Sequence, residues 1–403
     1  MYLSRVTARP DQAGRKPGPL RTPGMHPNRH FGLDALRAAA IGMVLVCHLH
    51  SEFDQVPGWA GGPLGILGVE LFFVLSGLLI GDILLRDLAS GLDGKRLRRF
   101  WMRRWMRTLP AYAATIAILF LALGNGSWLY VVFAQNVSRQ ALDFLPTSWS
   151  LCVEEWFYLL FPPVLLALSL RLSPRAAFLV GVVAFLVVPA ALRFGLALAV
   201  TQPFNDFYYR LPPLRLDAPA LGLLLAWLRR HNPAIWGRMD GRIGMLALGL
   251  SIWAAALALF AVDLTGRPVG APEIAGLAMT TVYLPLISAG CAAIIIWLHG
   301  APRWPTWSCL RLPVLWGSRL SYSVYLVHLP IFGWWAARIS NHPGAGGMIS
   351  VLGASVFVAW TLHVLVEQPI LALRDRPDVL QRRLRTDRSF RRSILTFAFI
   401  RRT

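Results

Sequence analysis

Charged residues are scarce in this chain. They make up 15% of its 403 residues, against about 25% in soluble domains, whereas 56% of the residues are hydrophobic. Its four cysteines show no CxxC spacing, so neither a disulfide framework nor a zinc site is expected. The first residues contain no apolar stretch typical of a secretory signal peptide. This composition leaves no region for a sizeable soluble enzyme and indicates a membrane protein.

Apolar runs recur through most of the chain and predict an all-α integral membrane protein of about ten transmembrane helices. We expect these helices at about 33–50, 65–85, 108–124, 147–170, 176–193, 214–228, 243–262, 274–298, 320–338 and 348–366. Arginines concentrate in alternate connections, above all between Arg86 and Arg107, and the positive-inside rule places those connections in the cytoplasm. An even number of helices then puts both termini in the cytoplasm, in the inner (plasma) membrane of a cell.

The formal net charge of +20 does not indicate a nucleic-acid partner, because the arginines lie in the tails and short loops. Residues 1–30 are polar, basic and rich in Pro and Gly, and we expect a disordered cytoplasmic tail. Residues 31–370 form the predicted membrane domain, surrounded by lipid, and residues 371–403 form a second basic cytoplasmic tail.

The first predicted helix carries Asp34, Arg37 and His48 within an apolar segment. A charged side chain near the centre of a spanning helix costs roughly 2.5 to 3.5 kcal/mol on insertion scales, so such residues usually face the protein interior and take part in function. Arg37 and His48 lie eleven residues apart, which puts them on one helix face, separated by roughly 16 Å along the axis.

The second predicted helix has Glu70 near its start and Ser76 two turns later, between Gly68 and Gly77. The glycines permit close approach of a neighbouring helix. An interfacial position of Glu70, with the glycines serving packing alone, is the alternative.

Arg104 and Arg107 lie three residues apart and therefore on one helix face. Two guanidinium groups suit a phosphate or pyrophosphate group. An ordinary positive-inside anchor that contacts anionic lipid explains the same spacing equally well.

Two further helices carry polar stripes. Ser150, Glu154 and Tyr158 put a hydroxyl, a carboxylate and a phenol on one face, where an acid that pairs with an arginine to hold helices together is the alternative. A second stripe, and two close pairs, are interpreted as interhelical hydrogen bonds or structural pairs: Ser321 with Tyr325 and His328, Arg215 with Asp217, and His363 with Glu367.

These blocks together resemble the acyltransferase 3 family, over about residues 31–370. The resemblance is carried, in order, by Arg37-x10-His48, GVELFFVLSG, R-x-x-R-x-x-P-x-Y from Arg104, S-x-x-x-E from Ser150, RLDA, SYSVYLVHLP and VEQP. The chain departs from the family where Glu70 replaces the common Asp and Trp156 replaces a frequent Gln.

The resemblance implies a ten-helix enzyme that transfers an acyl group, often acetyl from acetyl-CoA, to a hydroxyl of a sugar-containing acceptor. The acceptor would be a surface polysaccharide, a lipid-linked glycan or a secreted glycosylated metabolite. Acyl-CoA is then a co-substrate, and no metal or other cofactor is expected. Some relatives carry an added extracytoplasmic hydrolase-like domain, which we do not expect after residue 370 here.

In this interpretation His48 is the base, since imidazole titrates near neutrality and general base catalysis contributes roughly 10² to 10⁴-fold. Glu154 would hold the imidazole tautomer, and an acyl-histidine intermediate is an open alternative. Arg104 and Arg107 would bind the CoA phosphates, and Arg37 the pantetheine end or the thioester carbonyl. Supporting roles are expected for Asp34, Glu70, Ser76, Ser150 and Tyr325.

The main alternative is a multi-helix transporter of a small anion or glycan. The two halves of the chain show no duplicated pattern of broken helices, which inverted repeats would produce. A structural or lipid-binding protein would account for the basic tails but not for the linked polar stripes.

Overall fold

The computed structural model describes residues 30–53, 58–124, 126–137, 144–199, 209–264, 273–300, 308–340 and 343–375. These residues form helices and connecting turns without any strand. The two expected tails fall outside this part of the chain, apart from His30 and residues 371–375.

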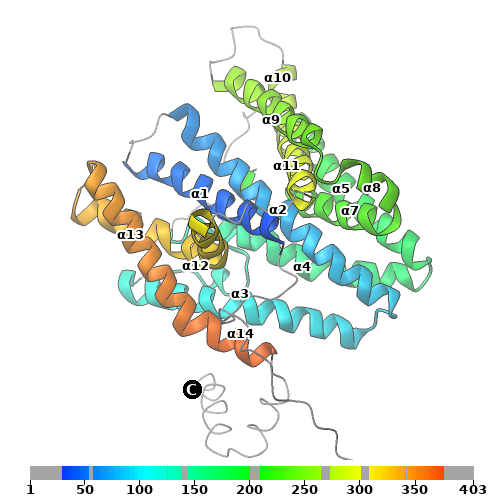
Figure 1. Ribbon diagram of the computed structural model, residues 1–403, viewed down its shortest axis with the longest axis horizontal. Helices are drawn as coiled ribbons and strands as arrows, with labels where there is room; N and C mark the ends of the chain where they lie inside the picture. The colour runs from blue at the N-terminus through cyan, green and yellow to red at the C-terminus, as the bar shows by residue number, and fades with distance from the viewer. Residues whose placement is uncertain are drawn as a thin grey trace, which may run out of the picture.

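The helices differ widely in length (Figure 1). The long ones are α1 (Phe31–Phe53), α2 (Gly58–Ala89), α3 (Gly94–Leu123), α4 (Ser148–Ser169), α5 (Pro174–Ala199), α9 (Ile243–Leu264), α11 (Tyr283–His299), α12 (Ser308–Arg338) and α13 (Ala345–Leu362). The shorter ones are α7 (Asp217–His231), α8 (Pro233–Met239), α10 (Glu273–Thr281), α14 (Gln368–Asp375), the 3-10 turns η1 (Trp128–Tyr130), η2 (Gln135–Val137) and η4 (Pro212–Leu214), and the π-helical η5 (His363–Glu367).

Eight helices in the described part of the chain are long and apolar enough to cross a membrane. The chain is therefore a multi-pass membrane protein. Two of the ten expected helices do not meet this condition on their own. Helix α7 has only 15 residues, and α12 has 31 residues but carries the Ser, Tyr and His stripe along its length.

The basic segment before the third expected helix is itself helical. Helix α3 begins at Gly94, where the Asp93 side chain accepts a hydrogen bond from the backbone N of Arg96 at 2.8 Å, and it ends at Gly124, which adopts φ 68°. The expected loop is therefore short, and most of its arginines lie on the first turns of α3. This matters for the site, because a helix fixes their directions.

Helix α2 is the centre of the bundle. In its most apolar stretch 67% of the residues are buried, against 17% in α9. It packs against α1 and α7, and α1 in turn packs against α12 (Figure 1). Large apolar side chains on the outer helices stay exposed, among them Leu121 and Leu198, as expected for surfaces that face lipid.

Glycines set the distance between α2 and its neighbours. A side chain on Gly77 would collide with the backbone oxygen of Pro219 in α7, and one on Gly222 would lie 2.6 Å from the backbone N of Leu78. A side chain on Gly68 would lie 2.6 Å from the backbone oxygen of Ala40. The close helix approach expected from Gly68 and Gly77 is confirmed.

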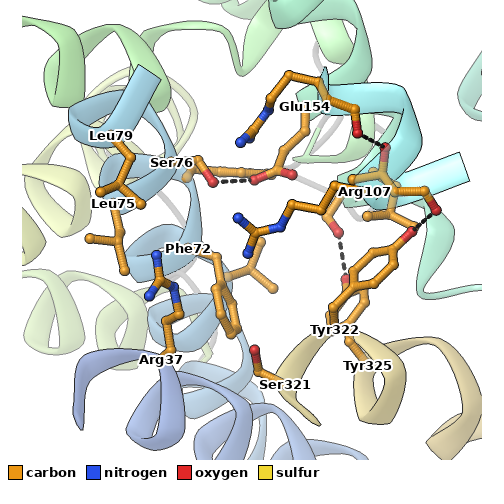
Figure 2. Close-up of a pocket in the computed structure, with 16 residues that line it drawn as sticks. Arg37, Phe72, Leu75, Ser76, Leu79, Arg107, Glu154, Ser321, Tyr322 and Tyr325 are labelled. Atoms are coloured by element: carbon orange, nitrogen blue, oxygen red, sulfur yellow. Dashed lines mark hydrogen bonds between the residues drawn. The ribbon is translucent and has the colours of Figure 1, made fainter. Parts of the chain in front are cut away.

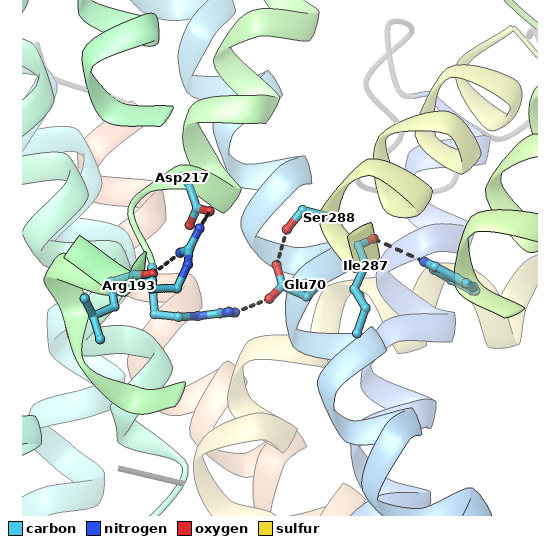
Figure 3. A network of polar contacts seen from close by, with 8 residues as sticks. Glu70, Arg193, Asp217, Ile287 and Ser288 are labelled. Carbon is cyan, nitrogen blue, oxygen red and sulfur yellow. Dashed lines mark hydrogen bonds and ion pairs between the residues drawn. The ribbon is translucent and has the colours of Figure 1, made fainter. Parts of the chain in front are cut away.

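Buried charges connect α2 with α11 and with the turn before α7, and connect α5 with α7 (Figure 3). Glu70 pairs with Arg215 and accepts a hydrogen bond from Ser288 Oγ at 2.7 Å. Arg193 pairs with Asp217 at 2.6 Å. The expected pairing of Arg215 with Asp217 is therefore wrong, because neighbouring helices supply a better placed partner to each.

Candidate active site

A polar cavity lies inside the bundle, between five helices. Its volume is about 100 Å³, and it is lined by residues of α1, α2, α3, α4 and α12. Figure 2 shows Arg37 and Arg107 reaching the same space from α1 and α3, with Ser76 and Glu154 bonded to each other on its wall. The residues on the wall that carry polar groups are Arg37, Ser76, Arg104, Arg107, Thr108, Ser150, Glu154, Ser321, Tyr322 and Tyr325.

Three arginines give this cavity its positive charge, and two of them are held in place by neighbours. Arg37 contacts Asp34 Oδ1 at 3.3 Å, and that buried carboxylate also accepts a hydrogen bond from Ser318 Oγ at 2.7 Å. Arg104 donates to the Tyr158 hydroxyl at 2.5 Å, and its guanidinium carbon lies 4.4 Å from the centre of the same ring. Arg37, Arg104 and Arg107, the three residues predicted to bind the donor, all line this cavity.

Arg104 and Arg107 form no salt bridge with any residue that the structure describes, although Glu154 and Glu155 are charged neighbours of Arg104. The Nε of Arg104 is buried without a hydrogen-bond acceptor. Arg37 and Arg104 are moreover like-charged neighbours of Arg107. Cations that gather in this way inside a membrane protein need an anion, so the cavity is suited to an anionic ligand.

The adjacent acidic residues of α4, Glu154 and Glu155, have different hydrogen-bond partners. Glu154 lines the cavity and accepts a hydrogen bond from Ser76 Oγ at 2.7 Å. Glu155 is buried on the other side, where Thr108 Oγ1 at 3.1 Å and Trp105 Nε1 at 3.2 Å donate to it. Glu155 therefore fastens α4 to α3, and Glu154 is the carboxylate that a ligand meets.

The hydroxyl groups of Ser150 and Tyr325 meet 2.6 Å apart on the same cavity wall, and Tyr325 donates to the Thr147 carbonyl at 2.9 Å. Along α4 the order is Ser150, Glu154, Tyr158, and their partners are Tyr325, Ser76 and Arg104. Polar groups therefore extend in steps from the arginines to the hydroxyl pair.

His48 lies beyond that hydroxyl pair and is not part of the cavity wall. Its Nδ1 is 2.8 Å from Nε2 of His328 in α12. The His328 ring lies beside that of Tyr325, with ring centroids 6.0 Å apart. The expected contact of Glu154 with the imidazole is therefore wrong: Glu154 is bonded to Ser76, and His328 takes the position beside His48.

Glu70 is also absent from the cavity wall, because it is fully buried against Arg215 and Ser288. It supports the site only through the packing of α2. The sequence pattern predicts only structural hydrogen bonds for His328 and does not single out Tyr322. In the structure His328 contacts His48, and Tyr322 lines the cavity. Their spacing from Ser321 and Tyr325 on α12 was the available signal.

The described residues offer no group of three or more His, Cys, Asp or Glu side chains that could hold a metal ion. Cys47, Cys152 and Cys291 are free thiols. The structural pair expected between His363 and Glu367 is confirmed, at 2.7 Å.

Two similar bacterial proteins carry O-acetyltransferase names. A protein of Staphylococcus aureus strain COL, provisionally named an O-acetyltransferase, is 32% identical over an alignment of 222 residues, which covers 49% of this chain and 34% of that protein. The O-acetyltransferase OatA of S. aureus strain NCTC 8325 is 30% identical over 224 residues, again 49% of this chain and 34% of that protein. The matched region thus spans about a third of the length of these relatives.

No solved structure matches the chain. The family model described as an acyltransferase domain, that of the acyltransferase 3 family, matches residues 30–364. This range contains all the described helices that line the cavity, together with His48 and His328. The chain therefore belongs to the acyltransferase 3 family.

Proposed function

We propose that this protein transfers an acyl group, acetyl in the first instance, from acyl-CoA to a hydroxyl group of a sugar-containing acceptor. The names of the S. aureus relatives support acetyl as the group and oxygen as the acceptor atom. The acceptor is a surface polysaccharide, a lipid-linked glycan or a secreted glycosylated metabolite.

The observation that carries this proposal is a pair of arginines that line one cavity and form no salt bridge with any described residue. Arg104 and Arg107 line a cavity that continues to a pair of hydroxyl groups. The pyrophosphate and 3′-phosphate of CoA supply the missing negative charge, and guanidinium groups bind such groups in a two-point geometry. The pantetheine arm then extends past Arg37, Ser76 and Glu154 toward Ser150 and Tyr325.

His48 serves as the base at the far end of this path. The acceptor hydroxyl gives its proton to the imidazole while its oxygen attacks the thioester carbonyl carbon. The C–S bond breaks, and the CoA thiolate leaves with the proton that the imidazolium returns. The products are an O-acyl ester and free CoA, so atoms and charge balance.

The membrane arrangement follows from the same proposal. Helices α7 and α12 complete the eight candidate spans to ten, and both termini lie in the cytoplasm with the arginines of α3. Residues 31–370 form the catalytic membrane domain, flanked by two basic tails, in the plasma membrane. CoA is cytoplasmic, so the donor reaches the arginines from their own side.

The test is acyl transfer from radiolabelled acetyl-CoA in membranes that contain the full-length protein. We expect label in an acid-stable, base-labile ester of a membrane or surface glycan, and no transfer by His48→Ala at matched abundance. Accumulation of intact acetyl-CoA inside sealed vesicles without ester formation would contradict the proposal and indicate a transporter.

A further inference from the structure

The two histidines that meet between α1 and α12 end in a backbone carbonyl. Nδ1 of His328 lies 2.8 Å from the backbone oxygen of Val324, one turn earlier in the same helix. Nε2 of His328 lies 2.8 Å from Nδ1 of His48. Three groups are therefore connected in one line: the Val324 carbonyl, the His328 ring and the His48 ring.

This line fixes where the ring protons are. A carbonyl oxygen only accepts hydrogen bonds, so Nδ1 of His328 must carry the proton that it donates to Val324. In a neutral imidazole the other nitrogen is then an acceptor, which makes Nε2 of His328 the acceptor. Nδ1 of His48 must consequently be the donor, and Nε2 of His48 keeps its lone pair.

The surroundings favour a neutral pair. His328 is completely buried, and the other ring groups around it, Tyr325 and Phe332, are uncharged. If His48 were protonated at rest, both of its ring nitrogens would carry a proton, and Nε2 would have no lone pair.

We propose that His328 is a positioning residue that holds His48 in the Nδ1–H tautomer, so that its Nε2 is the base in acyl transfer. This inference rests on the function proposed above and deepens it. His328 performs the orienting task that an acidic residue performs beside a catalytic histidine elsewhere, but it does so as a neutral acceptor anchored to the Val324 carbonyl. When His48 takes up the acceptor's proton, His328 Nε2 still accepts its Nδ1–H and so stabilises the cation that forms.

The first test reads the tautomers directly and needs no acceptor. Solid-state ¹⁵N spectra of the ring-labelled, full-length protein in lipid distinguish Nδ1–H from Nε2–H imidazole. The chain has nine histidines, so the His48 and His328 signals are identified by subtracting spectra of H48Q and H328Q. We expect the Nδ1–H tautomer in both residues. An Nε2–H signal from His48 overturns the inference even if the protein is active.

The second test compares two replacements of His328. The amide oxygen of Gln can reach the position of Nε2 and accept the hydrogen bond of His48, whereas the side chain of Leu cannot. With acetyl-CoA, we expect kcat to fall about hundredfold in H328L, within the range of general acid–base effects, and less than about tenfold in H328Q, with KM for acetyl-CoA unchanged in both.

The matched control is H363Q, which alters another buried histidine, one that pairs with Glu367 away from the cavity. It should keep the parental kcat. Parental kcat in H328L would overturn the positioning role. If instead the parent protein shows no acyl transfer at all, the proposed function fails, while the spectra still report whether His328 sets the tautomer.

Discussion

Replacing Arg104 by Lys separates a phosphate-binding site from a simple positive anchor. Lys keeps the charge that the positive-inside rule counts, so the topology should not change. The variant loses the planar guanidinium of Arg104, which donates to the Tyr158 hydroxyl at 2.5 Å and lies over that ring. The guanidinium also has a buried Nε without a hydrogen-bond acceptor, which Lys lacks. The change therefore alters geometry while it preserves charge.

The expected loss follows from these contacts. A hydrogen bond to a charged group contributes about 1.5 to 3 kcal/mol. Losing one phosphate hydrogen bond should therefore raise KM for acetyl-CoA about tenfold to a hundredfold, since about 1.4 kcal/mol corresponds to a factor of ten. We expect little change in the dependence on acceptor.

The assay is the acetyl-CoA concentration dependence of transfer in membranes with matched protein abundance. The control is Arg103→Lys on the same helix, because the Arg103 side chain is 56% exposed and forms a surface ion pair with Asp375 at 3.5 Å, worth at most about 1 kcal/mol. Tyr158→Phe should give an intermediate rise in KM. A parental curve for Arg104→Lys would refute phosphate binding by this residue and favour the anchor.

Three further predictions concern topology and stability. A cysteine at the exposed Ser90, in a protein without its native cysteines, should resist membrane-impermeant labelling in intact cells, and labelling from outside would contradict the cytoplasmic placement. Gly222→Val should prevent the contact of α7 with α2 and lower the yield of folded protein in detergent, whereas Gly195→Val, at a position with open space, should not, and equal yields would refute the close-approach argument. Glu70→Leu should destabilise the protein by about 3 to 5 kcal/mol, because it leaves Arg215 buried without its carboxylate. Adding Arg215→Met should restore part of that stability in thermal unfolding measurements. No recovery in the double variant would show that the unpaired Arg215 is not the cause of the loss.

The sequence determined which residues share a helix face. His48 follows Arg37 by eleven positions, Arg107 follows Arg104 by three, and Glu154 follows Ser150 by four. These are local spacings, and the helical repeat converts them into faces without help from the rest of the fold. The apolar runs likewise determined that the chain is a helical membrane protein, because backbone groups in lipid must be satisfied within each helix.

Only the tertiary structure decided which faces meet. His48 and His328 are 280 residues apart, Ser76 and Glu154 are 78 apart, and Glu70 and Arg215 are 145 apart, so no local spacing could pair them. Arg215 pairs with Glu70 and not with its near neighbour Asp217, because glycines let α2 and α7 come together. Helix packing also determines the partner of His48. Helix α12 packs on α1 and brings His328 to His48, while α4 places Glu154 next to Ser76 of α2. Helical periodicity acts within one segment, whereas these partners depend on how separate segments pack, and packing is a property of the whole bundle.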